Sequence, residues 1–223
     1  MNKKNISIIV IVLILIGLGS LYLFWAKPWQ PKPKGFPYEI DFSKIQNMNS
    51  ESFERLKQNY QSAKAEYEKN NSDFSALMTF AFINYQVGDY EKARDIYIKV
   101  GEDSPKNYSS FWDLGNTYIK LKDYQNAEKA YLKAIENGSD QARFYRVLGE
   151  LYWYNMPDKK NQIPDLYKKG LEKLPGDYDL MIGLAEYYRD TGDKTNAIKY
   201  YQEAIKKYPE YKTEIQAEID LLK

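Results

Sequence analysis

The side chains that could carry out chemistry in this 223-residue chain are carboxylates, lysines, arginines and hydroxyl groups. The sequence has no cysteine and no histidine, which excludes thiolate nucleophiles, disulfides, a Ser-His-Asp triad and most zinc or transition-metal sites. A pair of carboxylates such as Glu150 and Glu186 could still perform acid–base work. No phosphate-binding loop and no activated nucleophile accompanies this pair in the sequence. We therefore predict a protein that is not an enzyme and that holds no cofactor or metal.

Charge and composition narrow the class of partner. The net charge of +1 and the pI near 7.6 give no electrostatic source for holding phosphate backbones, so we predict no nucleic-acid partner. The chain contains 22 tyrosines, a residue that buries a large area and keeps a polar hydroxyl at its tip. Such residues suit helix contacts and partly hydrated binding surfaces.

The N-terminal region predicts a membrane anchor. Residues 6–25 form twenty consecutive residues without a charge, which as a helix would span about 30 Å, the thickness of a bilayer core. Residues 1–5 form a short tail with Lys3 and Lys4, and aromatic residues gather at the far end of the apolar stretch. A cleaved signal peptide is the alternative, but the stretch is long for one and no small-residue cleavage site follows it.

A proline-rich segment, residues 26–49, separates the predicted anchor from the rest of the chain. Its alternating prolines favour polyproline II, so we expect a semi-rigid stalk. Lysines on the two sides of residues 6–25 nearly balance, so the charge rule barely discriminates between the two orientations. A long C-terminal part behind an N-terminal anchor is commonly exported, and the Lys, Asn, Ile and Tyr bias is typical of AT-rich bacterial genes. We expect a single-pass protein of the bacterial inner membrane with an extracytoplasmic C-terminal domain.

Beyond residue 70 the sequence repeats with a period of 34 residues, once 36. The units are residues 74–107, 108–141, 142–177 and 178–211. Small residues recur in the first half of each unit, and in the second half a tyrosine recurs four residues after a small or apolar residue, a spacing that defines one helical face. Each unit is therefore predicted to be two amphipathic helices joined by a short turn. The small residues are Ala81, Gly115, Gly149 and Ala185, and the tyrosines are Tyr97, Tyr131, Tyr167 and Tyr201.

These repeats resemble the tetratricopeptide repeat, as the second unit illustrates with Phe111, Leu114, Gly115, Tyr118, Ala127, Tyr131 and Ala134. The resemblance implies an all-α solenoid in which these signature positions are structural. Residues 50–73 and 212–223 are predicted to be capping helices, because a solenoid ends its stack with a polar outer face; for residues 50–73 a degenerate half-repeat is the alternative. The third unit carries two extra residues between Trp153 and Gln162, which we expect to lengthen a loop.

The resemblance also implies where a partner would bind. In this family the first helices of successive repeats line a concave face, and its outward residues meet the ligand. Aromatic residues there would anchor a partner, and Arg143 with Arg146 would suit a carboxylate, so an apolar peptide with an acidic group is expected. The alternative is that the aromatics pack between first helices and the charges are solvated. The predicted partner-binding residues are Met78, Phe82, Tyr85, Trp112, Asn116, Arg143, Arg146, Trp153, Tyr154 and Arg189.

The predicted function is thus a membrane-anchored scaffold that binds a protein or peptide partner and serves in the assembly or organisation of cell-envelope proteins. The alternative is a structural component that associates with itself to form a homo-oligomer, since solenoid ends and exposed tyrosines can stack. Mass measurement in detergent discriminates between the two.

Overall fold

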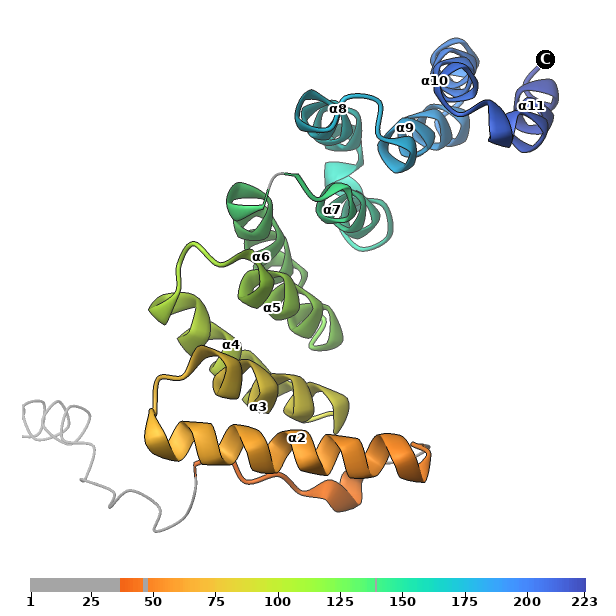
Figure 1. Ribbon diagram of the computed structural model, residues 1–223. Coiled ribbons are helices and arrows are strands. Elements are labelled where there is room, and N and C mark those ends of the chain that lie inside the picture. The colour runs from red at the N-terminus through yellow and green to blue at the C-terminus, as the bar shows by residue number, and fades with distance from the viewer. Residues whose placement is uncertain (1–36, 46–47, 139) are drawn as a thin grey trace, which may run out of the picture. The chain divides into compact units, whose positions relative to one another are not determined.

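The structure is a computed structural model that describes residues 37–45, 48–138 and 140–223 (Figure 1). The segment predicted to cross a membrane, residues 6–25, and most of the predicted stalk lie outside these ranges. Within them, no helix has both the length and the apolar character that a membrane span requires. The helices described below all lie in residues 40–223, which form one compact unit.

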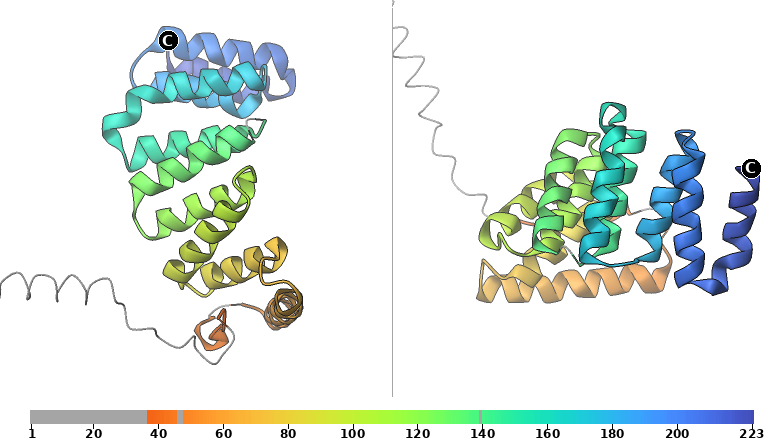
Figure 2. Two further views of the ribbon diagram at one scale, coloured as in Figure 1. Left: turned by 90° about the vertical axis from the view of Figure 1, so that its left-hand side faces the viewer. Right: turned by 90° about the horizontal axis from the view of Figure 1, so that it is seen from above.

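Every regular element in the described ranges is a helix. Each α-helix packs against the next one along the chain, and α3 also contacts α5 as α7 contacts α9 (Figures 1 and 2). The predicted all-α solenoid of tetratricopeptide type is confirmed. The α-helices are α2 (Ser50–Lys69), α3 (Phe74–Gln86), α4 (Tyr90–Asp103), α5 (Tyr108–Lys120), α6 (Tyr124–Asn137), α7 (Ala142–Tyr154), α8 (Ile163–Lys173), α9 (Tyr178–Asp190), α10 (Lys194–Lys207) and α11 (Lys212–Leu221), and the 3-10 helices are η1 (Phe42–Lys44), η2 (Pro157–Gln162) and η3 (Pro209–Tyr211).

Aspartate and asparagine side chains start most of these helices. Asp73, for example, accepts a hydrogen bond at 2.8 Å from the backbone N–H of Ala76, which satisfies one of the N–H groups that a helix leaves unpaired. Asn49, Asp89, Asn107, Asp123, Asp177 and Asp193 cap other helices in the same way. The turns inside the units are equally regular, because Gly88, Lys122 and Gly192 occupy the same place before the second helix with positive φ angles of 80°, 59° and 84°.

The packing between paired helices explains why small residues recur. A side chain at Gly115 would overlap the ring of Tyr131, and one at Gly149 would overlap Tyr167. The repeated tyrosines Tyr97, Tyr131 and Tyr201 are buried against the first helices with 1–2% of their surface exposed. The small residue on one helix therefore makes room for the tyrosine of the next, which is the contact that the spacing predicts.

The third unit departs from the others at its turn. Neither α7 nor α8 has a side-chain N-cap, and the expected longer loop is the 3-10 helix η2, which begins at Pro157. Glu128 of α6 fixes this segment: it accepts hydrogen bonds from the Lys159 ammonium and the Tyr152 hydroxyl, each at 2.6 Å. The inserted residues are thus held by a partly buried ion pair, in which 28% of the Lys159 side chain and 12% of the Glu128 side chain are exposed.

Candidate partner-binding face

The first helices of the four units, α3, α5, α7 and α9, share one outward surface, which we call the first-helix face. Two pockets lie along it and share Glu150 and Tyr154. The α5–α7 pocket has a volume of about 290 Å³ and is lined by Tyr85, Asn116, Ile119, Lys120, Tyr131, Val147, Glu150, Leu151, Tyr154 and Asn155. The α7–α9 pocket has a volume of about 310 Å³ and is lined by Arg146, Gly149, Glu150, Trp153, Tyr154, Ile163, Tyr167, Asp179, Ile182, Gly183, Glu186, Tyr187 and Asp190.

Tyr167 lines the α7–α9 pocket, and its ring fits between two glycines, Gly149 of α7 and Gly183 of α9. A Cβ atom on Gly183 would stand 2.7 Å from Cε2 of Tyr167, and one on Gly149 would overlap the same ring. The Tyr167 hydroxyl donates to the backbone carbonyl of Arg146 at 3.4 Å, and burial raises the pKa of this phenol far above its usual range. Tyr167 therefore forms a neutral, packed floor between α7 and α9.

Aromatic side chains form the rim of this pocket. The rings of Trp153 and Tyr187 meet edge to face with centroids 6.0 Å apart, and 76% of the Tyr154 surface is exposed. The ammonium of Lys160, in η2, lies 4.3 Å from the centroid of the Trp153 ring, so this ring already accepts a cation. An exposed aromatic side chain such as Tyr154, beside the half-buried rings of Trp153 and Tyr187, is a feature of protein-binding sites.

Four carboxylates and one guanidinium line the α7–α9 pocket. Arg146 lies 3.1 Å from Glu150 and 3.6 Å from Asp179, and the hydrogen bond to Glu150 raises the pKa of the guanidinium. Burial raises the pKa of Glu186, while the nearby Arg189 opposes this shift. The pocket is therefore acidic, with Arg146 occupied by its own neighbours.

The α5–α7 pocket is less charged. Asn116 accepts a hydrogen bond at 2.8 Å from the hydroxyl of Tyr131, which fixes both side chains at its base. Tyr85 reaches it from α3 and meets Tyr90 edge to face with ring centroids 5.4 Å apart. Burial raises the pKa of Tyr85, so this phenol is neutral over the physiological range.

Trp112 and Arg143 of the predicted set pack with each other and with the core. The Trp112 ring lies 4.8 Å from Phe144 and 5.5 Å from Tyr131, centroid to centroid, and the Arg143 guanidinium stands 5.5 Å from the Trp112 ring. Trp112 thus fills the space between neighbouring helices, as the alternative interpretation of the aromatics expects. Arg143 is exposed, and its cation covers the ring.

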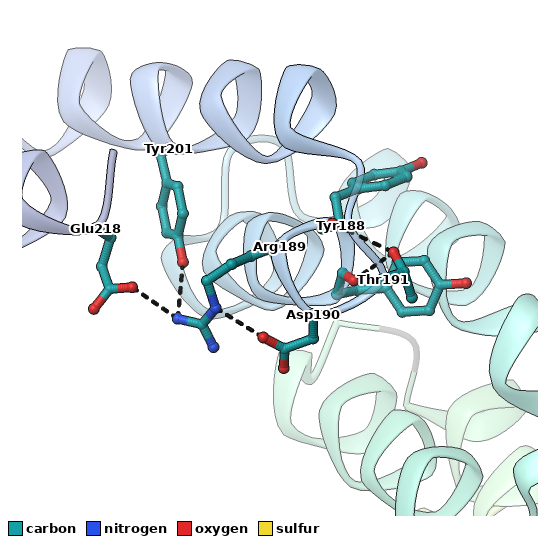
Figure 3. A network of polar contacts seen from close by, with 7 residues as sticks. Tyr188, Arg189, Asp190, Thr191, Tyr201 and Glu218 are labelled. Atoms are coloured by element: carbon teal, nitrogen blue, oxygen red, sulfur yellow. Dashed lines mark hydrogen bonds and ion pairs between the residues drawn. The ribbon is translucent and has the colours of Figure 1, made fainter. Parts of the chain in front are cut away.

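Arg189 points to the C-terminal helix (Figure 3). Its guanidinium lies 2.8 Å from Asp190, 2.8 Å from Glu218 of α11 and 3.3 Å from the Tyr201 hydroxyl. The hydrogen bonds to Asp190 and Glu218 raise the pKa of Arg189. Arg189 therefore connects α9 to α10 and α11 and is not among the residues that line the two pockets.

The structure brings five of the ten predicted partner-binding residues to the two pockets: Tyr85, Asn116, Arg146, Trp153 and Tyr154. Phe82 lies on α3 with 48% of its surface exposed, and Met78 is half-buried on the same helix. The prediction did not select Glu150, Asp179, Glu186 or Tyr187. The sequence could have identified the three acids, because they stand at outward positions of the first helices.

The Glu150–Glu186 pair does line one pocket, as acid–base chemistry would need. Glu150, however, is held by Arg146, and the described part of the chain contains no group of three or more metal-ligating side chains. A ligand in this pocket would therefore contact charged and aromatic side chains.

Comparison with known proteins agrees with this architecture. Models described as tetratricopeptide repeat match residues 108–137 and 179–211. Tetratricopeptide repeat protein 8 of Mus musculus is 28% identical over 134 residues, which is 59% of this chain but only 25% of the mouse protein. Protein ycf37 of Cyanophora paradoxa is 29% identical over 142 residues, covering 59% of this chain and 81% of that protein.

Solved structures share the fold at low identity. The crystal structure of MamA superposes with a TM-score of 0.57 at 18% identity and covers 75% of this chain and 99% of that one. PilF of Pseudomonas aeruginosa gives a TM-score of 0.56 at 17% identity, with 70% of each chain covered. The chain is therefore an all-α solenoid that carries tetratricopeptide repeats.

Proposed function

We propose that this chain is a scaffold that binds an extended segment of another protein along its first-helix face. The observation that carries the proposal is the joining of two pockets through Glu150 and Tyr154. Residues of α3, α5, α7 and α9 line the two pockets. A binding surface that extends over four helices suits an extended peptide better than a compact small molecule. Tyr154, largely exposed at the junction, supplies the kind of aromatic anchor that dominates binding energy.

We further propose that residues 6–25 hold the scaffold in a membrane and that it organises proteins of the cell envelope. The support is the uninterrupted apolar run of these residues and the basic and aromatic residues that flank it. A tethered scaffold keeps its partner at the membrane surface, where a modest affinity suffices because the local concentration is high.

The test is capture of partners by the full chain in detergent, with two variants that each replace two exposed apolar side chains by alanine. The first variant carries Phe82→Ala and Tyr154→Ala on the first-helix face. The control carries Leu132→Ala on α6 and Leu221→Ala on α11, whose side chains are 45% and 80% exposed away from this face. We expect specific partners to be lost with the first variant and kept with the control, while circular dichroism shows equal melting.

Partners that survive in the first variant would contradict the proposal for this face. A chain that captures only itself, shown by a doubled mass in detergent, would favour the alternative of a self-associating component.

A further inference from the structure

The chemistry of the α7–α9 pocket identifies a class of partner, given that the chain binds protein segments as proposed above. We propose that this pocket receives a lysine or arginine side chain of an extended partner segment, with an apolar or aromatic neighbour of that residue on Tyr154. This is opposite in charge to the acidic peptide that the sequence predicts.

The first step is the availability of the charges. Glu186 lines the pocket as a partly exposed residue, and the described residues show no hydrogen bond or ion pair to its carboxylate. Arg146, the one cation in the lining, lies against Glu150 and Asp179. An incoming carboxylate would have to displace these two acids and would face Glu186 and Asp190 as well. An incoming cation would instead meet Glu186 directly, and Asp190, although its carboxylate already lies 2.8 Å from Arg189, adds negative charge beside it.

The second step is the aromatic surface beside those acids. Trp153, Tyr154 and Tyr187 stand at the rim, and aromatic faces attract ammonium and guanidinium groups. Lys160 demonstrates the attraction within the chain, because its ammonium lies 4.3 Å from the centroid of the Trp153 ring. Lys160 is not part of the lining, so the pocket itself stays open to another cation.

The third step is size and depth. The volume of about 310 Å³ accommodates a long side chain, and the Tyr167 floor with Gly149 and Gly183 gives its methylene groups an apolar wall. Lysine and arginine bury their stems on such walls and keep their charged ends near carboxylates. Because Tyr154 lines both pockets, the neighbouring residue of the partner would lie on Tyr154, next to the α5–α7 pocket.

The test uses a random library of 12-residue peptides displayed on phage and selected on the immobilised full chain in detergent. The pocket variant carries Asp179→Asn and Glu186→Gln. The control carries Glu172→Gln and Glu210→Gln, which remove the same charge from exposed positions outside the pocket. A third variant, Tyr154→Ala, reports on the first-helix face as a whole.

We expect peptides enriched in lysine or arginine beside an apolar residue on the wild type and on the control, and loss of that enrichment on the pocket variant. Replacing the selected lysine by norleucine in a synthetic peptide should weaken binding about tenfold at low salt. The same replacement should have a much smaller effect on the pocket variant, because Glu186 and Asp179 no longer carry charge and only Glu150 and Asp190, each paired with an arginine, remain.

Each other result overturns the inference. If the selected peptides require Tyr154 for binding but are not enriched in lysine or arginine, the proposal of a basic partner is wrong and the proposed scaffold function is retained. If the selected peptides require neither Tyr154 nor the acids of the pocket, both the basic partner and the binding function of the first-helix face are contradicted. Selection of no peptide, together with a dimer that the pocket variant breaks, would make a second copy of the chain the occupant.

Discussion

The guanidinium of Arg189 lies 2.8 Å from the carboxylate of Glu218, so a residue at the end of α9 holds the C-terminal helix α11. Figure 3 shows Arg189 reaching toward Glu218 and Tyr201, and Arg189, although it stands at a position expected to face a partner, is not among the residues that line the two pockets. The contact leads to the first of five predictions.

Arg189→Met should loosen α11 more than the rest of the solenoid. It removes partly exposed ion pairs with Glu218 and with Asp190 and a hydrogen bond to the Tyr201 hydroxyl, so we expect a loss of about 0.5–1.5 kcal/mol. Hydrogen exchange should accelerate in residues 212–222 and stay unchanged in α5 and α6. Glu214→Gln on α11 is the control, and equal exchange in both variants would contradict a role for Arg189 as the tie.

Gly183→Ala should destabilise the α7–α9 contact. The added Cβ would stand 2.7 Å from Cε2 of Tyr167, and overpacking of this kind costs about 1–3 kcal/mol of unfolding free energy. Urea unfolding measures the loss. In a Tyr167→Leu background the same substitution should cost less, since the clashing ring is gone, and an unchanged cost would show that the strain lies elsewhere.

Asp113 should make stability fall as pH rises. Burial raises its pKa from 3.8 to about 6 in the folded state, although Arg143 opposes the shift. The folded state thus favours the neutral acid. The resulting contribution to the free energy of unfolding is complete below pH 3.8 and is lost as pH rises to about 6. Asp113→Asn should therefore gain about 1–3 kcal/mol at pH 7.5 and almost nothing at pH 3.5. Urea unfolding across this range, with Glu172→Gln as control, measures it, and an equal gain at both pH values would contradict the titration.

Lys122→Gly should stabilise the protein or leave it unchanged. Lys122 has a φ of 59°, a conformation that Gly88 and Gly192 adopt at the equivalent turns. Relief of this strain is worth about 1 kcal/mol, offset in part by the greater freedom of glycine in the unfolded chain. Gly192→Ala is the matched reverse change and should cost about 1 kcal/mol in thermal melts. A loss of stability in Lys122→Gly would mean that its side chain makes a stabilising contact.

Residues 6–25 should keep the chain in membranes after alkaline carbonate extraction. Leu13→Lys with Leu15→Lys places two charges in the apolar run, each costing about 2.5–3.5 kcal/mol at the centre of a span. The variant should be released by carbonate. Release of the wild-type chain under the same conditions would contradict the proposed anchor.

Much of the fold could be predicted because local spacing determines it. Gly115 and Tyr131 recur at fixed positions in a helix pair, and their contact is the one that the structure shows. Aspartates before the helices predict where helices begin, since each supplies its own cap. The inserted segment of the third unit was expected as a loop and is η2, because Glu128, 31 residues earlier, binds Lys159.

The site was harder to predict because ion pairs form between helices that are distant in the sequence. Outward position alone did not show that Arg146 would pair with Asp179 or that Arg189 would reach Glu218, 29 residues away. It also did not separate Trp112, packed on Phe144, from Tyr154, which is largely exposed. Contacts with neighbouring repeats determine whether such a side chain is paired, packed or exposed, and its position within one repeat does not.

The sharing of Tyr154 and Glu150 by two pockets has a thermodynamic consequence. An occupant of one pocket that moves either side chain changes a wall of the other, and two sites coupled in this way alter each other's affinity by the same factor. A segment long enough to enter both converts the second contact into an intramolecular step and gains avidity. Two short ligands placed side by side would instead compete for the orientation of a single tyrosine ring.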